Sequence, residues 1–258
     1  ADVKVAVDCL AHVTSLGEAA RQRGVVLGVV IEVDSGMHRA GVQPGAPVVA
    51  LARAIAAEPG LRFAGVMAWE AHVVAIADPA AKQAATAEAI GKLTASAQAC
   101  RDAGLEVDIV SCGGTGSFPY CTRQQGVTEV QAGGGIFSDV HYREHYKFDA
   151  PQALTVLMTV TSRPTPTRII VDAGKKTMSS DAAVPQPLGL PDAAPMRLSA
   201  EHGTIELHAP SETPRVGDKI EAIVGYSDTT VHLHERIHAI RDGRVAAVWE
   251  VAARGRIR

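Results

Sequence analysis

The sequence predicts an α/β domain followed by an antiparallel β domain. In the first 140 or so residues, short apolar runs alternate with helical stretches, which is typical of βα units around a parallel sheet buried on both faces. From about residue 150, apolar and polar residues alternate with a period of two around Pro-rich turns, which favours antiparallel strands. We therefore expect two domains, at residues 1–149 and 150–258.

The parallel sheet is expected to contain five strands. Each coincides with an apolar run, at residues 3–7, 25–33, 63–69, 107–112 and 128–132. Gly24 and Pro59 are typical of helix ends, and Asp78 followed by Pro79 is typical of a helix start, so helices are expected between the first four strands. A closed (β/α)8 barrel needs eight strands. The chain is therefore expected to hold only about five βα units of a barrel of this type.

The composition is that of a globular protein and excludes several classes of function. The 258 residues are 47% hydrophobic, 21% charged and 4% aromatic, with a formal net charge of -3. A weak negative charge and few aromatic residues argue against nucleic acid as a partner. No apolar run reaches the roughly 18 residues that a membrane span requires. The four cysteines show no CxxC spacing, so we expect reduced thiols and a cytoplasmic location.

Charged residues follow the second and third expected strands, at the end of the sheet where barrels and open α/β sheets place their sites. In EVDSGMHRAGV (32–42), Arg39 can donate to a carboxylate, a phosphate or a ring oxygen. The alternative is a surface ion pair of Arg39 with Glu32 or Asp34. In AWEAHV (68–73), His72 would be structural if it stood alone, but beside the other clusters it is a candidate acid or base.

Two glycine clusters follow the fourth and fifth expected strands, in SCGGTGSF (111–118) and QAGGGIF (131–137). Successive glycines after a buried strand let backbone N–H groups converge on an anion, and Thr115 and Ser117 can add hydroxyl groups. A plain glycine turn is the alternative for the first cluster taken alone. Because the two clusters end adjacent strands, we expect the backbone amides of residues 113–116 and 133–135 to form one phosphate cradle.

A histidine-rich segment, YSDTTVHLHERIH (226–238), lies in the expected β domain. His232 and His234 alternate along a predicted strand, where they could share a metal ion. The alternative is that the two histidines belong to an exposed polar face.

Taken in order, seven motifs resemble one known family. They are EVDSGMHRAGV, AWEAHV, CGGTGSF, EVQAGGGIFSD, VDAGKKTMSSD, LSAEHG and the C-terminal DTTVHLHERIHAIRDGRVAAVWEV. The family is that of the D-threonine aldolase and D-serine dehydratase-like enzymes, which are pyridoxal-phosphate enzymes with the fold of alanine racemase. The resemblance spans essentially the whole chain. It implies an eight-stranded barrel followed by a β domain, and a homodimer with active sites near the interface.

The resemblance also implies roles for individual residues. Arg39 would contact the cofactor ring, and His72 would lie on the substrate side as a catalytic residue together with Trp69, where the family usually has tyrosine. The phosphate would be held by residues of the glycine clusters and the glutamine before the second: Gly113, Gly114, Thr115, Gly116, Gln131, Gly133 and Gly134. In the tail, Tyr226 and Asp228 occupy the positions of the family's metal-binding pair.

The function implied by the resemblance is cleavage of D-β-hydroxy amino acids to glycine and an aldehyde. Pyridoxal 5'-phosphate and a divalent metal (manganese, magnesium or zinc) would be the cofactors. A D-serine dehydratase or an amino-acid racemase of the same fold is the first alternative, because one pocket serves these reactions. The second alternative is a non-catalytic fragment.

Two departures from the family pattern give further expectations. The family's Schiff-base lysine lies on the first barrel strand, and nothing in this chain matches that strand; Lys4 lies in a different context. We therefore expect this chain alone to be inactive, and to be completed by a preceding segment of about 100 residues, by a companion chain or by a partner. Tyr226 replaces a histidine of the metal-binding pair, so metal affinity is expected to be weakened, with Asp228 as the surviving ligand, or the site recruits a nearby histidine.

Overall fold

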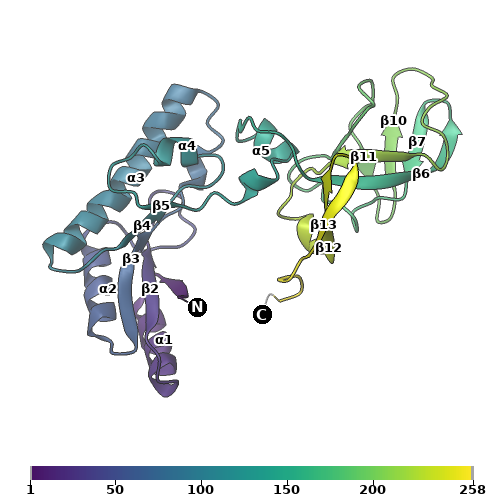
Figure 1. Ribbon diagram of the computed structural model, residues 1–258. Coiled ribbons are helices and arrows are strands. Elements are labelled where there is room, and N and C mark those ends of the chain that lie inside the picture. Colours follow the sequence, from purple (N-terminus) through teal and green to yellow (C-terminus); the bar gives the residue numbers. More distant parts are fainter. Residues whose placement is uncertain (1, 257–258) are drawn as a thin grey trace. The chain divides into compact units, whose positions relative to one another are not determined.

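The computed structural model describes residues 2–256 (Figure 1). The chain divides into two compact units, Ala1–Gly133 and Gly134–Arg258. The first contains a parallel sheet with helices and the second an antiparallel sheet, as the sequence predicts. The domain boundary expected between residues 149 and 150 stays a prediction.

The first unit is built on a parallel sheet with the strand order β1-β2-β3-β4-β5. The strands are β1 (Lys4–Val7), β2 (Leu27–Glu32), β3 (Leu61–Met67), β4 (Ile109–Cys112) and β5 (Glu129–Val130). The longer helices are α1 (Leu10–Gln22), α2 (Ala46–Ala57) and α3 (Pro79–Asp102), and the short ones η1 (Ala71–Val73) and α4 (Phe118–Cys121). The five parallel strands and the helices between the first four are confirmed. Within residues 2–256, β1 and β5 are the edges of this sheet.

The core of the first unit lies between the sheet and α1, α2 and α3, all of which contact β3. Val29 and Ile31 of β2, whose side chains point to the same face of the sheet, are fully buried in this core. Ile90 of α3 is buried in the same cluster. The Asp78 carboxylate accepts the Ala81 N–H at 2.7 Å and so caps α3. The helix start predicted at this Asp-Pro pair is therefore confirmed.

The second unit is an antiparallel sheet with the strand order β8-β11-β6-β7-β10-β9, and a separate hairpin of β12 and β13. The strands are β6 (Thr155–Thr165), β7 (Arg168–Val171), β8 (Gln186–Pro187), β9 (Arg197–Leu198), β10 (Gly203–Glu206), β11 (Lys219–Ile223), β12 (Arg236–Arg241) and β13 (Arg244–Glu250). Short helical turns are η2 (Gly134–Ile136), α5 (Val140–Glu144) and η3 (Val231–Leu233). On β6, alternate residues Val156, Met158 and Val160 are buried in the core. The period-two pattern is thus confirmed as a one-sided strand.

One prediction about the second unit is wrong. His232 and His234 do not alternate on a strand, because His232 lies in η3 and His234 ends that turn. The His232 ring lies 3.4 Å from the Asp228 carbonyl, and His234 Nε2 lies 2.6 Å from the Thr177 carbonyl. β12 begins only at Arg236. The two rings therefore contact different backbone oxygens, and the shared metal expected from strand alternation has no basis here.

Two findings bear on the environment of the chain. Within residues 2–256, none of the helices is long and apolar enough to cross a bilayer. All four cysteines are free thiols, with Cys9 exposed and the other three buried.

Candidate active site

The ends of β2, β3 and β4 bring three of the predicted site residues together. Arg39 donates to Glu32 at 3.2 Å, so the ion pair considered from the sequence is formed. The Arg39 guanidinium carbon also lies 5.0 Å from the centroid of the Trp69 ring, a cation–π arrangement. On the next loop, a Cβ placed on Gly114 would lie 2.7 Å from Trp69 Nε1. Trp69 therefore lies close to both Arg39 and the first glycine cluster.

The loop that carries Arg39 is shaped by Asp34. Its carboxylate accepts the N–H groups of Gly36 and His38, both at 3.0 Å, and contacts the His38 ring. Burial by itself would raise the pKa of Asp34, but these hydrogen bonds and the His38 ring outweigh it and lower the pKa to about 2. Ionised Asp34 thus holds the loop in the form that places Arg39 beside Trp69.

Replacing Asp34 by asparagine should lower the free energy of unfolding by about 2 kcal/mol near pH 7, from the depressed pKa. Asparagine keeps an oxygen for the loop N–H groups, so the loss is that of the charge. Because the folded-state pKa lies below the unfolded one, the stabilisation is present above about pH 4. It is lost as the pH falls toward the folded pKa of about 2. Urea unfolding of both proteins from pH 7 to pH 3 checks this, and a difference that does not shrink with falling pH would contradict it.

His72 lies next to this loop. It belongs to η1 and is exposed. A Cβ placed on Gly36 would lie 3.0 Å from His72 Nε2. Glycine at position 36 therefore makes room for the His72 ring against the loop that carries Arg39, and leaves the ring accessible to solvent.

Glu70 organises the first glycine cluster, and sequence reasoning did not identify it as a site residue. Its side chain is fully buried. It accepts the Gly113 N–H at 3.3 Å and the Ser117 hydroxyl, and Ser117 Oγ in turn accepts the Gly114 N–H at 3.1 Å. The start of the glycine loop is thus held from within by a carboxylate that lies next to Trp69 in sequence.

Two buried thiols complete the surroundings of Glu70. The Cys121 thiol lies 3.5 Å from Glu70 Oε1. Its hydrogen bond with Cys112, its burial and the charge of Glu70 all raise the pKa of the Cys121 thiol. Ligand atoms of these three residues lie within 4.8 Å of one another. Because the thiol is neutral and Glu70 is already hydrogen-bonded, the group is best described as an internal hydrogen-bonded cluster.

Gln131 connects the end of β5 to the glycine loop. Its N–H donates to the carbonyls of Cys112 at 3.0 Å and Gly113 at 2.9 Å, and its side-chain amide donates to Ser111 at 2.8 Å. Gly133 follows in the first unit and is exposed, with no atom within 4 Å of a Cβ placed on it. The ends of β4 and β5 are therefore side by side, as the cradle prediction requires.

The remaining residues of the glycine clusters differ in burial and in the unit to which they belong. Thr115 and Gly116 are buried in the loop. Gly134 lies in the second unit, where a Cβ on it would lie 2.2 Å from the Tyr142 hydroxyl. The Gly113 and Gly114 N–H groups shape the loop internally. Convergence of both clusters on one anion stays a prediction.

The loop nevertheless fits a phosphate-bearing cofactor. Gly113 has a φ of 80°, which favours glycine. A side chain on Gly114 would enter the space beside Trp69. Glycines at the end of a buried strand let a phosphate approach the backbone closely, and Arg39 lies over the Trp69 ring.

The predicted metal pair lies in a tyrosine cluster of the second unit. The Asp228 carboxylate accepts the Tyr142 hydroxyl at 3.3 Å and is also hydrogen-bonded by the Tyr226 hydroxyl. Burial, followed by the charge of Asp228, raises the pKa of Tyr142. For Tyr226, burial and its hydrogen bond to Asp228 raise the pKa. The His141 ring lies 4.9 Å from the Tyr226 ring between centroids.

This donor set fits a divalent metal poorly. Asp228 supplies one carboxylate, but the two phenols beside it are protonated and donate to that carboxylate. A neutral phenol is a weak ligand, whereas imidazole or a second carboxylate would bind firmly. The arrangement as it stands is a hydrogen-bonded carboxylate, with Asp228 as the ligand that a metal could use.

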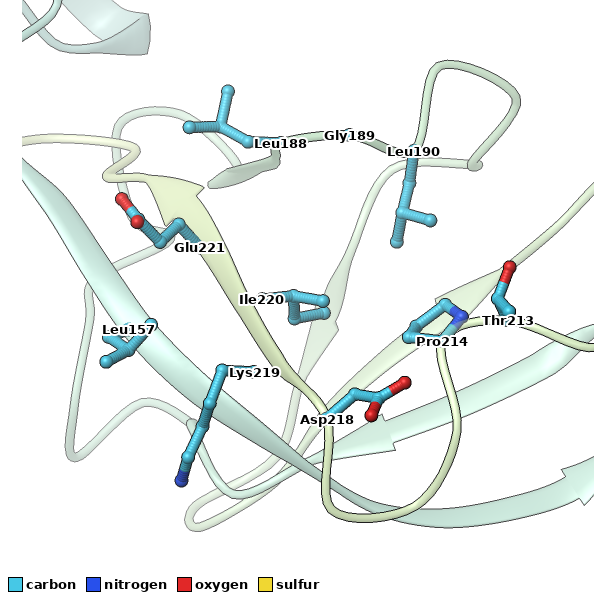
Figure 2. A pocket seen from close by; sticks show the side chains of 10 residues that line it. All are labelled: Leu157, Leu188, Gly189, Leu190, Thr213, Pro214, Asp218, Lys219, Ile220 and Glu221. Carbon is cyan, nitrogen blue, oxygen red and sulfur yellow. The ribbon is translucent and has the colours of Figure 1, made fainter. Parts of the chain in front are cut away.

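A separate pocket of about 740 Å³ lies on the second unit (Figure 2). It is lined by Leu157, Leu188, Gly189, Leu190, Thr213, Pro214, Asp218, Lys219, Ile220 and Glu221. None of the site residues predicted from the sequence lines it. We therefore do not assign the chemistry of the chain to this pocket.

The chain is similar to known proteins over nearly its whole length. Residues 1–140 match the family model for the alanine racemase N-terminal domain, and residues 153–240 match a putative serine dehydratase domain. The D-threonine aldolase of Arthrobacter sp is 32% identical, over 99% of this chain and 68% of the relative. The 3-hydroxy-D-aspartate aldolase of Paracoccus denitrificans (strain Pd 1222) is 34% identical over the same shares.

Solved structures give the same result. The D-threonine aldolase from Filomicrobium marinum superposes with a TM-score of 0.94 at 32% identity, covering 100% of this chain and 71% of that one. The D-threo-3-hydroxyaspartate dehydratase from Delftia sp. HT23 superposes with a TM-score of 0.84 at 27% identity, covering 96% and 72%. The chain therefore belongs to the D-threonine aldolase and D-serine dehydratase-like family, the pyridoxal-phosphate lyases with the alanine-racemase fold.

Proposed function

We propose that the protein cleaves D-β-hydroxy amino acids to glycine and an aldehyde, as a D-threonine aldolase does. The observation that carries the proposal is the position of Trp69 beside both Arg39 and Gly114, at the ends of neighbouring strands. A flat cofactor whose phosphate is held by the glycine loop would reach Arg39 from this position. Two aldolases among the relatives match nearly the full length of the chain.

The chemistry is divided between the cofactor and the chain. When bound, pyridoxal phosphate stabilises the negative charge left on the substrate Cα. Arg39 would contact the cofactor ring, and the glycine loop would hold the phosphate. Gln131 supports that loop through its hydrogen bonds to Gly113 and Ser111. Trp69 forms a wall of the substrate space. His72 accepts the proton of the substrate β-hydroxyl as the Cα–Cβ bond breaks, a role that its exposed ring permits.

We infer that a divalent ion, if bound in the second unit, uses Asp228 and is held loosely, because Tyr226 and Tyr142 donate hydrogen bonds to the same carboxylate. No step of the proposed reaction depends on this ion.

Replacing His72 by alanine should lower acetaldehyde release from D-threonine by about 100-fold or more, as for loss of a general base. The assay uses the purified protein with pyridoxal phosphate, alone and joined to a preceding segment that supplies the Schiff-base lysine. His208→Ala, an exposed histidine of the second unit, serves as the matched control and should leave the rate unchanged.

The products distinguish the alternatives. A 2-oxo acid with ammonia would indicate a dehydratase, and the L-amino acid a racemase. Cofactor retention without turnover in both preparations would favour the non-catalytic alternative. Unchanged acetaldehyde release by His72→Ala would show that His72 is not the base.

We also propose a cytoplasmic homodimer, completed at its open sheet edges by further polypeptide. The four free thiols suit a reducing compartment. Unpaired edges such as β1 and β5 are usually covered in proteins. The β12–β13 hairpin exposes Ile240, Val245, Val248 and Trp249, and such apolar surface favours association. Light scattering that gives a monomer at micromolar concentration would argue against the dimer.

A further inference from the structure

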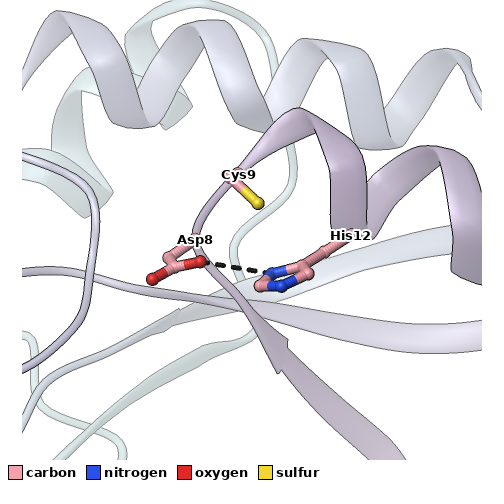
Figure 3. A group of neighbouring side chains, drawn as sticks. All are labelled: Asp8, Cys9 and His12. Carbon is pink, nitrogen blue, oxygen red and sulfur yellow. Dashed lines mark ion pairs between the residues drawn. The ribbon is translucent and has the colours of Figure 1, made fainter.

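Three different metal-ligand side chains meet where β1 passes into α1. They are Asp8, Cys9 and His12 (Figure 3). Asp8 Oδ1 lies 3.2 Å from His12 Nδ1, and one carboxylate oxygen, the Cys9 sulfur and one His12 nitrogen lie within 4.8 Å of one another. In a tetrahedral zinc site, with bonds of about 2.0 Å to oxygen and nitrogen and about 2.3 Å to sulfur, ligand atoms lie roughly 3.3–3.7 Å apart. The Asp8–His12 distance is already close to that spacing.

Local backbone structure explains why these side chains converge. Cys9 is the extended N-cap residue of α1, and its side chain makes no capping hydrogen bond. His12 lies in the first turn of the helix, over the N-cap position. Asp8 accepts the Gly41 N–H at 3.2 Å through Oδ2, which leaves Oδ1 directed toward His12. One ligand is thus fixed by the neighbouring loop, and the other two by the helix start.

The donor set and its exposure favour zinc over harder ions. Thiolate and imidazole are ligands that zinc prefers, whereas calcium and magnesium require oxygen. Cys9 is the one cysteine of the chain that is exposed, and the His12 side chain is also solvent-accessible. An ion can therefore enter from solvent and keep a water molecule in its fourth position.

We propose that Asp8, Cys9 and His12 bind one zinc ion with water as the fourth ligand. This site lies in the first unit, whereas Asp228 lies in the second. The bound ion joins the end of β1 to the start of α1. Through the Gly41 contact of Asp8, it also fixes the loop that presents Arg39.

The test is a titration of the purified, metal-stripped protein with cobalt(II), which reports a thiolate ligand by a charge-transfer absorption band in the near ultraviolet. We expect this band to saturate at one equivalent and to disappear on addition of zinc. Cys9→Ser should abolish the band, and His12→Ala should weaken cobalt affinity at least about tenfold, since loss of even an outer partner of a metal ligand costs 10–100-fold.

Two controls keep the readout specific. Asp228→Ala removes a carboxylate but no thiolate, and Cys100→Ala removes a buried thiol outside the group; both should retain the band. Zinc should also raise the melting temperature of the unmodified protein but not that of Cys9→Ser. Absence of the band overturns the proposal. A band that survives in Cys9→Ser overturns it as well and assigns the thiolate to Cys112 or Cys121.

Discussion

Glu70→Ala is expected to abolish retention of pyridoxal phosphate and to lower the free energy of unfolding by about 3–5 kcal/mol. Loss of the carboxylate leaves the buried Gly113 N–H without an acceptor and leaves the Ser117 hydroxyl only its 3.4 Å contact with the Gly114 carbonyl, at about 1–3 kcal/mol for each donor. Without their shared acceptor, the loop loses the shape in which Gly113 and Gly114 stand beside Trp69. Urea unfolding measures the stability, and cofactor absorbance after dialysis measures retention.

Two further variants separate the role of Glu70 from a general effect of losing a carboxylate. Glu70→Gln keeps one oxygen acceptor, so it should cost less, about 1–2 kcal/mol, and retain part of the cofactor. Glu88→Ala removes a glutamate of α3 that is 74% exposed and paired with Lys92, and should stay within about 0.5 kcal/mol of the parent protein. Full cofactor retention by Glu70→Ala would refute the proposal that Glu70 holds the glycine loop in its cofactor-binding shape.

Tyr226→His is expected to tighten manganese binding in the second unit by about 100-fold, or about 2.7 kcal/mol. The change replaces a phenol that is protonated at neutral pH by an imidazole that offers a free nitrogen. It also removes one of the two hydroxyl groups that donate to Asp228. The carboxylate and the new imidazole would then form a two-residue metal site.

Calorimetric titration with manganese measures this effect, in a Cys9→Ser background so that the site at β1 does not contribute. Tyr226→Phe is the matched control, because it removes the hydrogen bond without adding a ligand, and it should not tighten binding to a similar extent. Equal manganese affinity in the parent and Tyr226→His would mean that the ion binds elsewhere or not at all.

The sheet could be predicted from the sequence because its strands are continuous apolar runs between clear helix signals. β2 is an example, with its fully buried Val29 and Ile31. The short helices α4 and α5 span four and five residues, too few for a helical period to be visible. The strand predicted around His232 was wrong for a related reason. Over three residues, a single turn of 3-10 helix and an alternating strand have the same sequence pattern.

The site was predictable in part. Arg39, Trp69 and Gly114 follow strand ends, and the geometry of a parallel sheet brings such positions together. Glu70 was missed because glutamates are rarely buried without a partner, and its partners, a backbone N–H and a serine more than 40 positions away, cannot be read from local pattern. The tyrosine contacts of Asp228 could not be predicted either, since Tyr142 lies 86 positions away from it in the sequence.

The close approach of Trp69 to Gly114 limits how these two positions can vary. A Cβ at position 114 would lie 2.7 Å from the indole nitrogen, so a bulky aromatic residue at 69 and any side chain at 114 exclude each other. Natural or laboratory variants that widen the substrate range by changing one of these positions should therefore change the other as well. A library should therefore randomise positions 69 and 114 together, because a smaller residue at 69 is needed before a side chain at 114 can be accommodated.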